Sequence, residues 1–68
     1  MKKSLQRGMT GQQIITVLER QGWDEIGSNG PHAKLRSNKT GNTILVPRRG
    51  RELTPGTFNQ IAKAVSQD

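Results

Sequence analysis

The residues best suited to chemistry lie in the segment 30–36, which reads GPHAKLR and contains the only histidine of the 68-residue chain. Polar and apolar residues alternate along this segment, a pattern typical of a half-buried strand. The apolar residues Ala33 and Leu35 are expected to point into a core. Three polar side chains then share the opposite face: His32, Lys34 and Arg36. An imidazole beside two permanent cations suits contact with a phosphodiester backbone, where histidine can accept or donate a proton.

RNA is the substrate that such a group of residues can cleave without a further cofactor. It carries its own nucleophile, the 2′-hydroxyl beside each phosphate, so the protein has to provide a proton acceptor and positive charge. In this interpretation His32 is the catalytic residue, and Lys34 and Arg36 stabilise charge. The chain has no cysteine, and its five carboxylates are scattered, which argues against a zinc site and against two-metal nuclease chemistry. We therefore expect neither a metal nor a cofactor.

The net charge of +6 is concentrated in one part of the chain. Residues 32–51 contain six cations and no carboxylate. A contiguous polycation predicts a polyanionic partner, and nucleic acid is favoured over a merely solvated basic surface. Three arginines that follow the last expected strand are predicted to hold the RNA backbone: Arg48, Arg49 and Arg51.

Two helices are predicted near the ends of the chain. Thr10 and Gln13 have the spacing of a capping box, and Gly22 suits the end of the helix that follows. Thr54 is the expected cap of the second helix, and Pro55 its first helical position. An apolar stripe at helical spacing follows this proline: Phe58, Ile61, Ala62 and Val65.

Three strands are predicted between the helices: Trp23–Ile26, a strand that contains His32 and ends near Ser37, and Thr43–Val46. The turn-rich stretch 27–30 separates the first two, and a hairpin loop at 38–42 separates the last two. Two helices packed on one face of a three-stranded antiparallel sheet would bury every apolar face. The predicted fold is therefore α+β with the order α-β-β-β-α, the layout of a double-stranded-RNA-binding domain.

A single domain is expected at residues 9–68. Residues 1–8 include Lys2, Lys3 and Arg7 and are predicted to form a flexible basic arm or to reflect an alternative start. The longest apolar run is 44–46, so neither a membrane span nor a signal peptide is expected. A cytoplasmic location is the default expectation.

Several segments resemble the HicA toxins of bacterial type II toxin–antitoxin systems. Residues 10–23 (TGQQIITVLERQGW) are similar to the opening helix of that family, and Gly30-Pro31-His32 stands where the family has Gly-Ser-His. Residues 43–47 (TILVP) and 51–58 (RELTPGTF) resemble the family's third strand and last helix. The resemblance runs from about Met9 to Val65.

The resemblance implies an mRNA interferase, a metal-independent endoribonuclease that arrests growth and is silenced by a HicB-like antitoxin. The family's catalytic histidine corresponds to His32. The sequence departs from the family pattern at Pro31, which replaces a serine, and at Ala33, which replaces a frequent second histidine. Arg48-Arg49 stands where many relatives have a histidine. Two alternatives use the same basic face without catalysis: an RNA- or DNA-binding module, and an interaction protein that docks an acidic partner.

Overall fold

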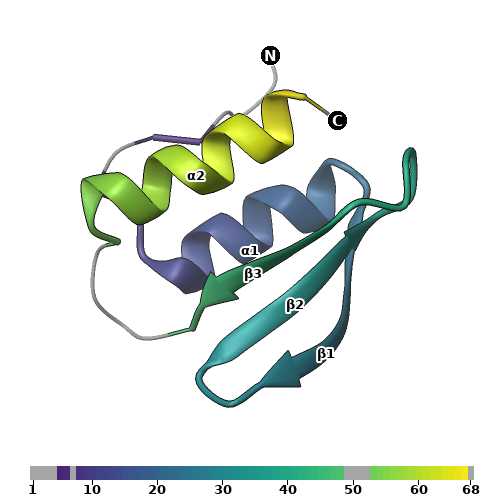
Figure 1. Ribbon diagram of the computed structural model, residues 1–68, viewed down its shortest axis with the longest axis horizontal. Helices are drawn as coiled ribbons and strands as arrows, with labels where there is room; N and C mark the ends of the chain where they lie inside the picture. The colour runs from purple at the N-terminus through teal and green to yellow at the C-terminus, as the bar shows by residue number, and fades with distance from the viewer. Residues whose placement is uncertain (1–4, 7, 49–52, 68) are drawn as a thin grey trace.

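A helix, three strands and a second helix follow one another along the chain, in the order that the sequence predicts (Figure 1). The computed structural model describes residues 5–6, 8–48 and 53–67. Within these ranges lie α1 (Gly11–Arg20), β1 (Trp23–Asn29), β2 (His32–Ser37), β3 (Thr43–Pro47) and α2 (Pro55–Ser66). Most of the expected basic arm lies outside the described residues.

Both helices begin at the predicted threonine caps. The Oγ1 atom of Thr10 accepts a hydrogen bond from the backbone N–H of Gln13 at 3.2 Å, and the Gln13 side chain accepts one from the Thr10 N–H at 2.9 Å. Thr54 accepts from the N–H of Thr57 in the same way, with Pro55 at the start of α2. These caps satisfy N–H groups that have no partner inside a helix. The start of each helix is therefore determined by local sequence.

The sheet has the order β1-β2-β3, and both pairs of neighbours are antiparallel. β1 is longer than predicted, because pairing with β2 continues until Asn29 lies opposite His32. A bulge at Ile26, between the pairs formed by Glu25 and Gly27, absorbs one extra residue of β1. A bulge lets a strand continue past a glycine-containing segment that otherwise indicates a turn.

Both helices pack on the same face of the sheet (Figure 1), and no helix of the described residues lies over the other face. The two large aromatic residues, Trp23 and Phe58, lie in the core with 2% and 8% of their surface exposed. The core is one cluster made by both helices and all three strands: Ile14, Ile15, Leu18, Trp23, Ala33, Leu35, Val46, Phe58 and Ile61. Neither helix is long and apolar enough, over its described residues, to cross a membrane.

The start of α1 approaches the end of β3 closely at Gly11. A Cβ at this position would overlap the carbonyl oxygen of Pro47 and lie 2.7 Å from its carbonyl carbon. We expect Gly11→Ala to lower the free energy of unfolding by about 1–3 kcal/mol in urea denaturation, because the helix start or the end of β3 must move.

The matched control for this substitution is Gly56→Ala. Gly56 also lies in the first turn of a helix, but a Cβ there meets nothing within 4 Å. This change is expected to be neutral or slightly stabilising. Equal losses of stability in the two variants would contradict the close approach of α1 to β3.

Candidate functional site

His32 is the first residue of the central strand and follows a tight hairpin turn. The turn consists of Gly30 and Pro31, and Gly30 has a φ of 64°. A positive φ at the first central position of a two-residue turn favours the type II′ geometry. The backbone N–H of Arg48 donates to the Pro31 carbonyl oxygen at 2.9 Å. The turn beside His32 is therefore tied to β1 on one side and to the end of β3 on the other.

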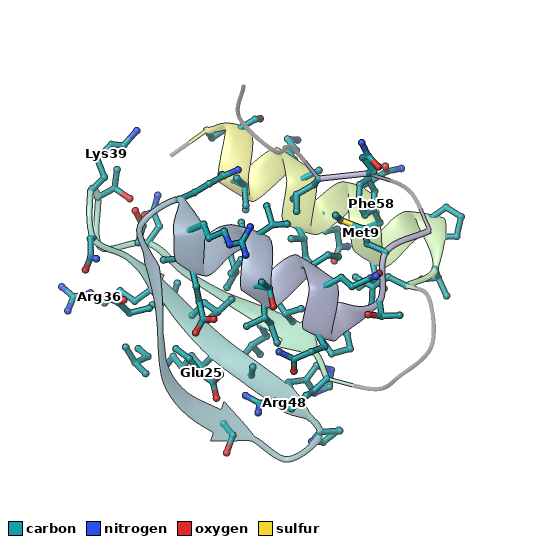
Figure 2. All side chains as sticks on the ribbon, turned by 180° about the vertical axis from the view of Figure 1, so that it is seen from behind. Met9, Glu25, Arg36, Lys39, Arg48 and Phe58 are labelled. Atoms are coloured by element: carbon teal, nitrogen blue, oxygen red, sulfur yellow. The ribbon has the colours of Figure 1, made fainter. Side chains whose placement is uncertain are left out.

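The residues of β2 alternate between the two faces of the sheet, as the sequence predicts. Ala33 and Leu35 are fully buried beneath the helices. His32 is half-buried on the opposite face, and Lys34 and Arg36 are exposed there. Figure 2 shows Arg36 projecting outward at the edge of the molecule. Since residues on one face of a strand are about 7 Å apart, the imidazole and the two cations form a line. We call this side of the sheet the open face.

Neither residue directly opposite His32 on the adjacent strands is ionisable. The Cα partners of His32 are Asn29 in β1 and Pro47 in β3. Within the described ranges, the one carboxylate with a position on the open face is Asp24, and it lies opposite Arg36 at the far end of the line. The described residues also include no group of three histidine, cysteine or acidic side chains that could hold a metal ion. The sheet therefore presents His32 as a single acid–base group.

Arg48 has a partner that the sequence does not indicate. Its guanidinium forms an ion pair with the carboxylate of Glu25 in β1, and both residues are labelled in Figure 2. The two side chains are 43% and 32% exposed, so the pair remains in contact with solvent. Contact of Arg48 with RNA stays a prediction. Arg49 and Arg51, for which the same role is predicted, lie outside the described residues.

Two residues that the sequence analysis did not single out also belong to the open face. Gly27 in β1 and Leu45 in β3 are the Cα partners of Lys34. Leu45 is 45% exposed, which is unusual among the large apolar residues of the chain. The alternation of β3 could have indicated Leu45, whereas the position of Gly27 depends on the bulge at Ile26.

The comparisons with known proteins agree with this architecture. The family model for the HicA toxin of bacterial toxin–antitoxin systems matches residues 11–66. This range extends from the first residue of α1 to the last residue of α2, and so includes the whole sheet and His32. Searches among curated proteins and among solved structures gave no match. The match covers most of the chain and confirms the resemblance seen in the sequence, so the chain belongs to the HicA family of toxins from bacterial toxin–antitoxin systems.

Proposed function

We propose that this toxin is a metal-independent endoribonuclease, an mRNA interferase, and that His32 is its catalytic residue. The observation that carries the proposal is the position of the only imidazole on the open face, in line with Lys34 and Arg36. Such a face meets an RNA backbone with positive charge and offers a proton acceptor beside it. Cleavage of messenger RNA arrests translation, which is an effect expected of a toxin.

The reaction that these residues support is transesterification within RNA. His32 takes the proton of the 2′-hydroxyl, and the 2′-oxygen attacks the adjacent phosphorus. The bond from phosphorus to the 5′-oxygen of the next nucleotide then breaks, which leaves a 2′,3′-cyclic phosphate on the upstream fragment. Lys34 and Arg36 stabilise the additional negative charge on the phosphoryl oxygens.

His32 is the only imidazole of the chain, and it accepts the proton of the 2′-hydroxyl in the first step. Ala33 is fully buried and belongs to the opposite face of β2. The Cα partners of His32, Asn29 and Pro47, do not ionise. In-line attack places the departing 5′-oxygen on the opposite side of phosphorus from the 2′-oxygen, so solvent water protonates it, and the imidazolium then releases its proton to solvent.

Incubation of the purified toxin with RNA in EDTA tests the proposal. We expect fragments that carry a 2′,3′-cyclic phosphate at one end and a 5′-hydroxyl at the other. Binding of RNA without cleavage, in EDTA and in Mg²⁺, would instead indicate a non-catalytic binding module. Cleavage that requires Mg²⁺ would contradict the metal-independent mechanism.

The salt dependence of RNA binding shows which cations contact the RNA backbone, those of the open face or Arg48. Each backbone contact contributes roughly one unit to the slope of log affinity against log salt. We expect Lys34→Gln and Arg36→Gln to reduce this slope by about one unit each. Because Glu25 already pairs with Arg48, Arg48→Gln should reduce the slope by clearly less.

Glu25→Gln is the matched variant for this measurement, because it removes the partner of Arg48 and leaves the arginine in place. It should increase RNA affinity at low salt. A slope that falls by a full unit in Arg48→Gln, with no gain in Glu25→Gln, would show that Arg48 contacts RNA despite its ion pair.

We also propose that a HicB-like antitoxin inhibits the toxin by covering the open face. Toxins of this family pair with an antitoxin, and the open face carries the two cations Lys34 and Arg36. An acidic partner placed across them relieves their mutual repulsion and excludes RNA from the same surface. A partner that binds only the folded toxin also stabilises it, by about 2.7 kcal/mol at a hundredfold excess over its Kd.

Hydrogen exchange on the toxin–antitoxin complex tests this placement. Protection is expected to be concentrated in residues 31–37 and in the backbone that follows β3. The amides on the outer sides of α1 and α2 should exchange as they do in the free toxin. Protection confined to the helices would mean that the antitoxin acts at a distance from His32.

A further inference from the structure

A shallow groove of about 470 Å³ lies over Lys34, lined by Ser28, Lys34, Thr43, Ile44 and Leu45. Gly27, which has no side chain, lies directly opposite Lys34 in β1, next to the groove. A Cβ built at Gly27 meets nothing within 4 Å, so the space beside the lysine is open. The bulge at Ile26 determines this register, because it brings a glycine rather than a larger residue opposite Lys34.

The lining of the groove combines three kinds of chemistry. Lys34 provides a cation, Thr43 provides a hydroxyl group on the same face, and Leu45 provides an apolar surface that is 45% exposed. Leu45 and Lys34 are Cα partners, so the apolar surface and the cation lie side by side. A nucleotide carries the matching groups: an anionic phosphate, polar base edges and a flat base that contacts apolar side chains.

The size and position of the groove favour a nucleotide over a protein segment. Its volume falls within the range of about 300–1,000 Å³ that is typical of small-ligand sites. A protein partner buries roughly 800 Å² on each side, far more than one exposed leucine offers. Lys34 lies about 7 Å from His32 along the same face, which places the contents of the groove beside the imidazole.

We propose that this groove binds one nucleotide of the RNA substrate, adjacent to the scissile phosphate. The base lies against Leu45, the phosphate contacts Lys34, and the hydroxyl of Thr43 contacts a polar edge of the base. Leu45 is therefore a specificity-determining residue, and the groove sets the base preference of cleavage. This inference rests on the proposed endoribonuclease function.

Leu45→Ala tests the assignment, with Ile26→Ala as its matched control. Among the residues that the structure describes, Ile26 is the other large apolar residue with high exposure, at 52%, and it does not line the groove. Cleavage of an RNA pool with randomised bases gives the base preference of each variant. Leu45→Ala should reduce the discrimination between the best and worst base by about tenfold, and Ile26→Ala should leave it unchanged. Equal effects of the two substitutions would overturn the proposal.

Gly27→Val also tests whether the groove binds a nucleotide, because the valine side chain would project beside Lys34 and occupy space there. The backbone of Gly27 does not require a positive φ, and the space around its Cβ is empty, so the variant should fold. We expect cleavage of the preferred sequence to fall by at least about tenfold, with the thermal midpoint of unfolding unchanged or raised. Full activity with an unchanged base preference in this variant would overturn the proposal.

A binding measurement separates failure of the groove from failure of the proposed function. The probe is a short RNA with 2′-deoxy substitutions, which cannot cyclise, added to the toxin labelled at its leucine and isoleucine methyl groups. Shifts of the Leu45 methyl signals, with Ile26 unaffected, support the groove even if the wild type cleaves no RNA. If the wild type cleaves RNA but the Leu45 signals do not move, the groove proposal is wrong and the catalytic one stands. Shifts produced only by an antitoxin would assign the groove to a protein partner and overturn the proposal.

Discussion

Replacing His32 with alanine is expected to lower the rate of RNA cleavage by about a hundred- to ten-thousand-fold, the usual cost of losing a general base. The imidazole is the only one in the chain, and neither of its Cα partners, Asn29 and Pro47, can take over proton transfer. The rate should be measured in single-turnover reactions with excess toxin. Binding of a non-cleavable RNA should change little, because the cations at Lys34 and Arg36 remain.

Two comparisons show whether the lower cleavage rate comes from lost proton transfer or from a less stable fold. His32→Gln keeps a polar side chain of similar reach but cannot transfer a proton near neutral pH, so it should be as inactive as His32→Ala. His32 is half-buried on the open face, and removal of its ring leaves no cavity in the core. Both variants should therefore unfold within about 0.5 kcal/mol of the wild type. Cleavage within tenfold of the wild type in either variant would show that His32 is not the catalytic group.

The features of this fold that the sequence predicts are those encoded locally. The threonine caps of α1 and α2 need only residues within one turn, and the alternation in β2 needs only the contrast between residues such as Ala33 and Lys34. Together these local signals are enough to assign the order of elements and the face to which His32 belongs.

The features that the sequence did not predict depend on contacts between distant residues. The bulge at Ile26 extends β1 beyond its predicted end, because pairing with β2 outweighs the turn preference of the following glycine and serine. The ion pair between Arg48 and Glu25 joins residues 23 positions apart. Which carboxylate meets which arginine depends on the register of three strands. The surroundings of Lys34 also depend on register, since the bulge places Gly27 and not Ile26 opposite that lysine.

The family match covers the helices and the sheet and does not test the proposed cleavage of RNA, so the chemistry must be tested on the substrate as well as on the protein. A single 2′-deoxy nucleotide at the scissile position is expected to abolish cleavage at that phosphate. The proposed reaction has no other nucleophile, because the attacking oxygen belongs to the RNA. The effect should be complete at the substituted position and absent at other sites in the same strand.

The matched control for this substrate is a 2′-deoxy nucleotide placed one position downstream of the scissile phosphate. This control also replaces one ribose with deoxyribose, but it leaves the attacking 2′-hydroxyl in place. Cleavage should therefore continue at close to the normal rate. Cleavage at the deoxy-substituted phosphate would require a water nucleophile. His32 would then have to activate water, and the product would carry a linear phosphate instead of the 2′,3′-cyclic one. The identity of the product ends therefore decides between the two reactions even if both substrates are cut.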